Sequence, residues 1–321
     1  AQLDEMTDCE LKKAVEHTHV FAELTPGHKV RLVSAMQDNG HSVGFLGDGV
    51  NDIPALNEAN VGISIDTAVD AAKDAADVVL LQKDLNVLEQ GVMEGRKTFT
   101  NMLKYIKITA SSNFGNIFSI ICASAFLPFL PMTSIQILLL NLLYDTLCIV
   151  LPWDNVDEEE MLSPRDWSGK TLRQFMLSFG PISSLFDITT FLFLYYFLCP
   201  MLCGGATYLQ LTDPSLQLQY VALFQTGWFL ESMWTQVLIL HFLRTSKIPF
   251  FQSRASAPVI FITLVGIIAF TSLTFVGGAS LFGLTKLPLW YFVFLLLVVS
   301  LYMLLNSVAK YFYKKKYQEL I

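Results

Sequence analysis

Six long apolar segments in series place the strongest constraint on what this 321-residue chain can fold into. They lie at about 102–127, 133–152, 174–199, 219–243, 258–280 and 289–311. A helix of roughly 20 apolar residues is long enough to cross the hydrocarbon core of a bilayer. The alternative is a set of buried helices in a large soluble protein, which six such segments in succession disfavour. We therefore expect an α-helical multi-pass membrane domain of six helices over residues 102–312.

Charge is divided unevenly along the chain. Residues 1–97 contain 17 acidic and 8 basic side chains, whereas residues 98–321 contain 11 acidic and 13 basic ones. With residues 1–83 in the cytoplasm, twelve basic residues of the hydrophobic part fall on the cytoplasmic side and only Lys286 falls outside. This pattern predicts a location in the lipid of the inner or plasma membrane, with the basic tail at 313–321 also cytoplasmic. No basic patch indicates binding to nucleic acid.

The first 83 residues alternate between helix and strand signals. Helices are expected at 25–36, 54–59 and 69–76, and apolar strands at 42–46, 61–65 and 78–81, the first of them buried. Such alternation is typical of a parallel α/β sheet, of which residues 1–83 supply about half a domain. From Asp84 a helical pattern without proline continues to Lys104. Residues 84–101 are therefore expected to form a linking helix that leads into the first apolar segment.

A polar loop, Gly47–Asp52, follows the first expected strand and precedes a helix. Ligand sites of parallel sheets lie at the carboxyl ends of strands, and carboxylates suit a hard cation such as Mg²⁺ beside phosphate oxygens. Asp48 is the candidate Mg²⁺ ligand, while Asn51 and Asp52 are candidates for holding phosphate or water. Lys29, on a neighbouring helix, is the candidate phosphate clamp. A solvated turn is the alternative for the Gly-Asp-Gly triplet taken alone.

The segment Leu46–Leu56 resembles the hinge signature of P-type ATPases. Phe21–Lys29 resembles the segment of the same family that carries a phosphate-binding lysine. Further similarity follows in order at 76–80, 94–96 and 111–113. The resemblance covers essentially the whole chain and implies a partial haloacid-dehalogenase-like, Rossmann-type phosphorylation domain.

The resemblance assigns roles within that domain. It implies that Asp48 and Asp52 hold the catalytic Mg²⁺, and that Lys29, Asn51 and Asp52 surround the phosphoryl group transferred from ATP. The family's phosphorylated aspartate lies in an Asp-Lys-Thr-Gly-Thr motif, which this sequence lacks. Because Ala1 begins within ordinary soluble sequence, the chain is expected to be a fragment. It is expected to be inactive alone and to need an N-terminal portion, in the same polypeptide or as another chain.

Polar side chains within the first two apolar segments form the candidate ion site. Asn113 and Asn116 are three residues apart, and Asn141 and Asp145 are four apart, so each pair shares one face of a helix. Acidic and amide groups in a membrane helix are costly and usually functional. The resemblance places the transported ion at all four residues. Hydrogen bonding between helices, worth roughly 1 kcal/mol each, is the alternative.

The family's calcium pumps show glutamate where Asn116 stands, so this site has fewer carboxylates and suits a partly hydrated ion such as Mg²⁺. Residues 141–157, 180–184 and 224–228 most resemble the bacterial magnesium-importing members. We therefore expect ATP-driven import of Mg²⁺ through an aspartyl-phosphate. The alternatives are a pump for Ca²⁺ or Mn²⁺, a catalytically silent truncated subunit, and a secondary transporter, although no internal repeat supports the last.

Three further features have weaker interpretations. Asp187 and Glu231 are expected to pair with hydroxyl or amide groups in the bundle, and Glu231 has a second candidate role in ion exit or proton counter-transport. The acidic run at 157–160 is expected to be a solvated loop, with a Mg²⁺-sensing surface as the alternative. Cys199 and Cys203 are either a disulfide or two unpaired apolar residues.

Overall fold

The computed structural model describes residues 2–82, 84–165, 167–276, 279–318 and 320. The chain forms two compact units, Ala1–Glu94 and Gly95–Ile321. The first unit contains small separate hydrophobic clusters, and the second is built around one large cluster. The expected division into an α/β part and a helical part therefore agrees with the two separately packed units.

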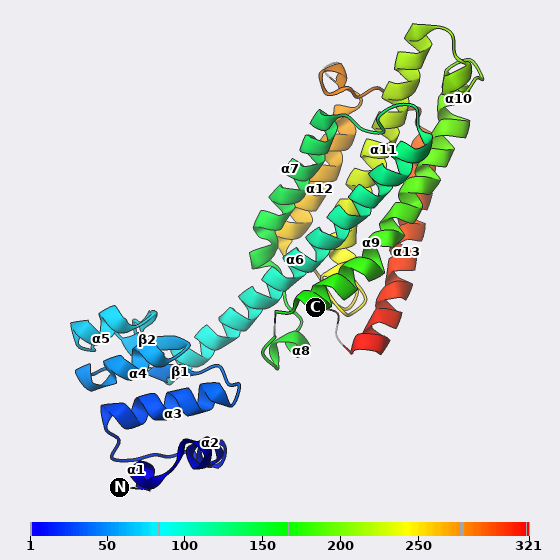
Figure 1. Cartoon of the computed structure of the whole chain (residues 1–321). Coiled ribbons are helices and arrows are strands. Elements are labelled where there is room, and N and C mark those ends of the chain that lie inside the picture. Colours follow the sequence, from blue (N-terminus) through cyan, green and yellow to red (C-terminus); the bar gives the residue numbers. More distant parts are fainter. Residues whose placement is uncertain (1, 83, 166, 277–278, 319, 321) are drawn as a thin grey trace. The chain divides into compact units, whose positions relative to one another are not determined.

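A three-stranded parallel sheet forms the centre of the first unit (Figure 1). The strands are β1 (Gly44–Leu46), β2 (Val61–Ile65) and β3 (Val78–Leu80), in the order β1-β2-β3. The helices are α1 (Gln2–Glu5), α2 (Asp8–His17), α3 (Pro26–Asp38), η1 (Val50–Asp52), α4 (Ile53–Glu58) and α5 (Asp70–Ala75). Both strand pairs are parallel, which confirms the predicted strand direction.

Local signals account for helix α3. Its N-cap, Thr25, accepts a hydrogen bond from the amide of His28 at 3.3 Å, and Pro26 occupies the first helical position. The helix ends at Asn39, and Gly40 follows with a φ of +89°. A positive φ is readily adopted only by glycine, so the Asn-Gly pair stops the helix where the sequence predicts.

The prediction of a buried first strand is wrong. β1 is shorter than the expected segment 42–46, and Leu46 is 42% exposed. β2 is its only neighbour among the described strands, whereas β2 is flanked on both sides. A strand at the edge of a sheet is covered less than a central one, and local hydrophobicity does not reveal which position a strand will occupy.

Helices make up the second unit. They are α6 (Leu85–Phe126) from Gly95 onward, α7 (Ser134–Val150), α8 (Glu158–Met161), α9 (Gly169–Phe193), α10 (Cys199–Leu202), α11 (Pro214–Leu243), α12 (Ala257–Leu273) and α13 (Tyr291–Tyr317). Between them lie the short 3₁₀ helices η2 (Leu151–Trp153), η4 (Tyr208–Gln210) and η5 (Ala279–Phe282) and the π-helix η3 (Leu194–Leu198). Figure 1 shows the long helices running side by side. α11 contacts α7, α9, α12 and α13, so it forms the centre of the bundle.

Three helical stretches of the described chain are long and apolar enough to cross a membrane: Ser134–Trp153, Gly169–Leu202 and Tyr291–Tyr317. α12 is strongly apolar but has only 17 residues. α11 is longer, but it carries buried polar residues, including Gln225 and Glu231. Each of the six predicted segments falls on a long helix, while the count of six crossings stays a prediction.

Two predicted boundaries need correction, and one is confirmed. Within the segment 258–280, helix α12 ends at Leu273. The predicted end is too late because the sequence stays apolar beyond the end of the helix. Residues 277 and 278 lie outside the described part. α13 continues to Tyr317, so the lysines of the expected tail lie on the helix. The predicted continuous helix from Asp84 to Lys104 is confirmed by α6.

Two glycines bring α6 and α9 into close contact. A Cβ atom on Gly180 would lie 2.6 Å from Cδ1 of Phe114, and one on Gly115 would lie 3.0 Å from the carbonyl oxygen of Gly180. Ser184 on α9 also donates a hydrogen bond to the carbonyl of Gly115 at 2.9 Å. Small residues permit such close packing of helices, which fixes α9 against the middle of α6.

Candidate functional site

Lys29 and Asp52 form an ion pair in the first unit. The Lys29 Nζ atom lies 2.5 Å from Asp52 Oδ1, and the two side chains are 27% and 12% exposed. Asp52 Oδ2 accepts a hydrogen bond from the amide of Gly49 at 3.3 Å. Burial acts to raise the pKa of Asp52, but the hydrogen bonds from Lys29 and Gly49 outweigh it and lower the pKa below its ordinary value.

Gly47 allows the loop to close over this pair. A Cβ atom at Gly47 would lie 2.5 Å from the Cβ atom of Asp52, which excludes any larger residue without movement of the loop. Ser64 on β2 donates a hydrogen bond to the carbonyl of Gly47 at 2.9 Å, and the amide of Val69 bonds the carbonyl of Asp48 at 3.2 Å. The sheet therefore holds the loop at the carboxyl ends of its strands.

The loop and the ion pair border a cavity of about 500 Å³. Its lining comprises Lys29, Phe45, Leu46, Gly47, Asp48, Asp52, Ile65, Leu80, Asp84 and Leu85. The structure thus brings together Lys29, Asp48 and Asp52, three of the four residues predicted to handle phosphate and Mg²⁺. Asn51 is exposed on η1 and is not among the lining residues.

The two carboxylates of the cavity differ in their suitability for a metal ion. Asp48 is exposed, and its carboxylate oxygens have no hydrogen-bond donor among the described residues. Asp52 already binds Lys29 with one oxygen and Gly49 with the other. Mg²⁺ is typically held by one or two carboxylates together with phosphate oxygens and waters. Asp48 fits such a ligand, and Asp52 fits better as the group that positions Lys29.

The four predicted ion ligands lie on α6 and α7. Asn113, Asn141 and Asp145 are exposed, and Asn116 is half-buried. Within the described part of the chain, none of these side chains has a hydrogen-bond or ion-pair partner. The alternative role in bonding one helix to another therefore has no contact to support it here. The described part of the second unit includes no group of three or more His, Cys, Asp or Glu that could hold a metal ion.

A contact between α6 and α7 shows how these residues are related. Thr109 Oγ1 lies 3.9 Å from Cys148 Sγ, within hydrogen-bonding range for sulfur. Asn113 follows Thr109 by one turn, and Asp145 precedes Cys148 by one turn. Because the helices run in opposite directions, both residues are displaced the same way from the contact, by roughly 5 Å. Asn113 and Asp145 therefore lie at one level of the bundle.

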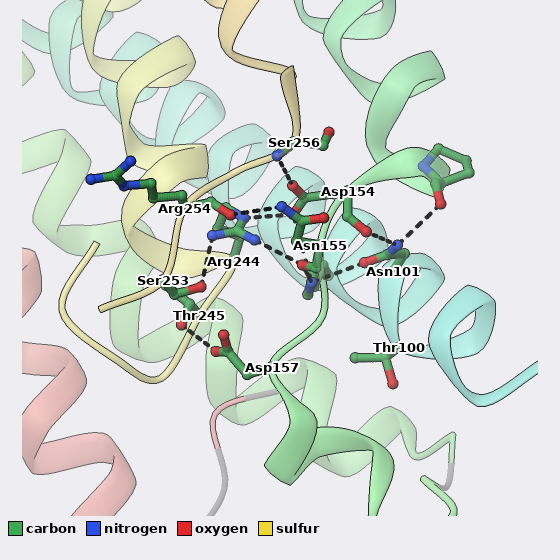
Figure 2. Close-up of polar contacts among 12 residues, drawn as sticks. Thr100, Asn101, Asp154, Asn155, Asp157, Arg244, Thr245, Ser253, Arg254 and Ser256 are labelled. Carbon is green, nitrogen blue, oxygen red and sulfur yellow. Dashed lines mark hydrogen bonds and ion pairs between the residues drawn. The ribbon is translucent and has the colours of Figure 1, made fainter. Parts of the chain in front are cut away.

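A buried polar cluster, which we call the junction, was not predicted from the sequence. The Arg244 Nε atom lies 2.5 Å from Asp154 Oδ2, and the Lys104 Nζ atom lies 3.6 Å from the same oxygen. The three side chains are at most 2% exposed. Figure 2 shows Asp154 and Arg244 together with Asn101, which donates to the backbone carbonyl of Asp154 at 3.0 Å. The junction joins α6, the turn after α7 and the end of α11.

The predicted solvated loop at 157–160 is wrong for two of its residues. Thr245 donates a hydrogen bond to Asp157 at 2.5 Å (Figure 2), and Glu160 is 9% exposed and paired with Arg165. Burial acts to raise the pKa of Asp157, but the hydrogen bond from Thr245 contributes to a net lowering. The run looks solvated in the sequence because the partner of Asp157 lies 88 residues away.

The sequence does contain a signal for the junction. Lys104 and Arg244 are among the basic residues predicted to lie on the cytoplasmic side, where a charge needs no partner. Asp154 lies within the segment 141–157 that carries the family resemblance. An acid directly after an apolar segment, with basic residues at the ends of two others, is compatible with a buried ion pair. Only the fold shows that they meet.

The remaining predictions concern buried groups. Asp187 accepts hydrogen bonds from the hydroxyl of Ser119 and the indole of Trp228, which confirms the expected pairing within the bundle. Glu231 is 1% exposed, and its Oε2 atom has no hydrogen-bond partner in the described part. Cys199 and Cys203 are both buried and free, as the second interpretation of this pair predicts.

Comparison with known proteins identifies relatives of the chain. A family described as "Cation transporting ATPase, C-terminus" matches residues 129–312. "Magnesium-transporting ATPase, P-type 1" of Salmonella typhimurium is 47% identical over 98% of this chain and 33% of its own length. The protein of the same name from Escherichia coli K12 is 47% identical over 99% and 34%. "Calcium-transporting ATPase 1" of Bacillus cereus is 42% identical over 46% and 17%. The chain spans about a third of the length of the magnesium-transporting relatives.

Proposed function

Because this chain belongs to the cation-transporting P-type ATPases and corresponds to their C-terminal portion, we propose that it acts in ATP-driven transport of Mg²⁺ across the cell membrane. The observation that carries the proposal is the 47% identity to magnesium-transporting pumps, which extends over both units. The first unit supplies part of a phosphorylation site, and the helices supply the path of the ion. The nucleophilic aspartate comes from an N-terminal portion of the pump.

The geometry of the first unit supports the phosphorylation role. Lys29 presents a cation beside the cavity, held in place by Asp52, and Asp48 presents a carboxylate that has no partner among the described residues. In phosphoryl transfer the protein contributes mainly positioning and charge stabilisation. Lys29 would neutralise phosphate charge, Asp48 would hold the Mg²⁺ that comes with ATP, and Asn51 would contact the phosphoryl group. A partial haloacid-dehalogenase-like phosphorylation domain is part of this proposal, and the position of Lys29 and Asp48 beside the cavity supports it.

The Lys29 assignment is tested by measuring the phosphoenzyme formed from radiolabelled ATP in the full-length pump. Lys29→Ala should lower the rate of its formation or breakdown by about a hundredfold, as for other lost stabilisers of transition-state charge. Lys73→Ala is the matched control, because Lys73 forms an ion pair with the exposed Asp70 on α5, bonds the carbonyl of Asp66, and is not among the residues that line the cavity. Equal rates in the two variants contradict the assignment of Lys29.

The identity of the ion follows from the relatives, and the membrane site is consistent with it. Asp145 supplies one carboxylate, and Asn113, Asn116 and Asn141 supply amide oxygens, a set that suits an ion which keeps part of its water. The alternative transported ions are Ca²⁺ and Mn²⁺. Mg²⁺ should stimulate the ATPase activity of the full-length pump in the transport assay. Ca²⁺ added in the presence of MgATP should not stimulate it. Vesicle uptake of Ca²⁺ at the rate of Mg²⁺ uptake overturns the magnesium assignment.

The proposed topology has six crossings, with both the first unit and the end of α13 in the cytoplasm. The lysines at the end of α13 and the twelve-to-one distribution of basic residues support it. Single cysteines placed at Lys286 and Lys315, in a background without other reactive cysteines, test it in intact cells. A membrane-impermeant thiol reagent should label position 286 and not position 315. Labelling of both or of position 315 alone contradicts the topology.

A further inference from the structure

Two acidic side chains meet in the interior of the helical bundle, apart from the predicted ion ligands. Asp187 on α9 and Glu231 on α11 are 2% and 1% exposed. Trp228, which donates a hydrogen bond to Asp187, precedes Glu231 by three residues on α11, so Glu231 lies on the face of α11 that is turned towards Asp187. Neither belongs to the junction around Asp154. A pair of carboxyl groups that face each other in a low-dielectric interior cannot both hold a negative charge at moderate cost.

The surrounding donors distinguish the two groups. Ser119 donates to Asp187 Oδ2 at 2.6 Å, and Trp228 Nε1 donates to Asp187 Oδ1 at 2.8 Å. Both oxygens of Asp187 therefore accept hydrogen bonds, as an ionised carboxylate requires. Glu231 Oε2 is buried and receives no hydrogen bond from the described residues. A charged oxygen without a donor is unfavourable there, whereas a protonated one becomes a donor to Asp187.

Among the residues that the structure describes, no positive group compensates the pair. Among the described residues, the titratable groups that face it are Tyr302 and Tyr291, both on α13. Tyr291 donates its hydroxyl to the carbonyl of Gly227 at 2.6 Å, so it is engaged elsewhere. α6 contributes the uncharged Ser119, and no Lys, Arg or His of the described chain acts on either carboxyl group.

We propose that Asp187 and Glu231 form a proton-binding site inside the bundle, with one proton carried by Glu231 and donated to the ionised Asp187. The site joins three helices, because Ser119 belongs to α6 and lies one turn from Asn116. Loss of the proton would place two negative charges against each other and loosen the packing of α9 on α11. The protonation state is thereby linked to the helix that carries the predicted ion ligands.

Infrared spectroscopy of the resting full-length pump, without ATP, tests the site independently of the transport function. At neutral pH the wild type should show a carbonyl band of a protonated carboxylic acid that moves on transfer to D₂O. Glu231→Gln should remove one such band, because the amide keeps the shape and the hydrogen bond to Asp187 but carries no acid. Glu89→Gln, on the exposed start of α6, is the matched control and should leave the band unchanged.

A second variant keeps the test decisive where Glu231→Gln does not fold. Trp228→Phe removes one donor from Asp187 but retains an aromatic ring against Phe191. Asp187 then becomes a stronger acceptor for the remaining donors, so the band of the Glu231 carboxyl should shift to lower frequency. A spectrum of Glu231→Gln identical to the wild type, or an unshifted band in Trp228→Phe, overturns the proposal.

Discussion

Two sets of polar residues in the helical unit, each with members on α6, have opposite environments. The junction buries Asp154 between Lys104 and Arg244, and each of its charges has a partner. The predicted ion site, around Asn113 and Asp145, is exposed and has no partner within the described chain. A buried charge must be compensated by the protein itself, whereas an exposed one is free to bind an ion or another segment. The difference separates residues that hold the helices together from residues available for a ligand.

The largest effect on stability is expected from a substitution in the buried junction. Asp154→Asn leaves Lys104 and Arg244 buried without a counter-charge, which should destabilise the pump by about 3–5 kcal/mol. Thermal unfolding of the purified full-length pump measures the loss. Asp145→Asn is the control, since Asp145 has no hydrogen-bond or ion-pair partner to lose in the described part of the chain. The comparison fails if both variants unfold at the same temperature.

For the exposed, predicted ion site, a substitution should change ion-dependent activity without lowering the stability of the protein. Asp145→Asn removes the only carboxylate among the four predicted ligands. Loss of one charge-assisted contact is worth about 1.5–3 kcal/mol, equivalent to a roughly ten- to hundredfold weaker apparent affinity for Mg²⁺. Ion-stimulated ATPase activity across a Mg²⁺ titration measures it. An unchanged titration, with stability preserved, means that the transported ion binds elsewhere.

At the edge of the junction a pH-dependent effect is expected. Thr245→Val removes the hydroxyl that bonds Asp157, at a cost of about 1 kcal/mol near neutral pH. Because the pKa of Asp157 is lowered in the folded state, its stabilisation is present above the unfolded pKa, roughly 4. It is lost as the pH falls through the folded pKa. The stability difference between variant and wild type should therefore shrink on acidification, and a constant difference from pH 7 to pH 3 contradicts this origin.

The smallest effect is expected where the same region meets solvent. The Lys247 Nζ atom lies 3.4 Å from Glu159 Oε1, but the two side chains are 32% and 62% exposed. Solvent-exposed pairs contribute about 0–1 kcal/mol and are screened by salt. Glu159→Gln should leave the unfolding temperature within error at moderate ionic strength. A loss as large as that of Asp154→Asn would show that exposure does not separate the two classes of ion pair.

Local sequence was enough for the elements and for part of the phosphate site. The Thr25-Pro26 cap, the Asn39-Gly40 stop and the parallel strands were predictable because capping, turn formation and strand alternation depend on neighbouring residues. The glycines on either side of Asp48 indicate a tight loop for the same reason. The exposure of Leu46 was not predictable, since the position of a strand within a sheet depends on segments elsewhere in the chain.

The sequence by itself determined a soluble α/β part, a chain of apolar helices, and the family to which both belong. Only the tertiary structure decided which charges are paired. Asp154 and Arg244 are 90 residues apart in the sequence, and Asp187 and Glu231 are 44 residues apart. Hydrophobic periodicity specifies that a helix is buried and on which face, but not which helix it faces. Helix packing determines the partners of a buried charge. Those partners in turn determine whether the charge stabilises the bundle or holds a proton.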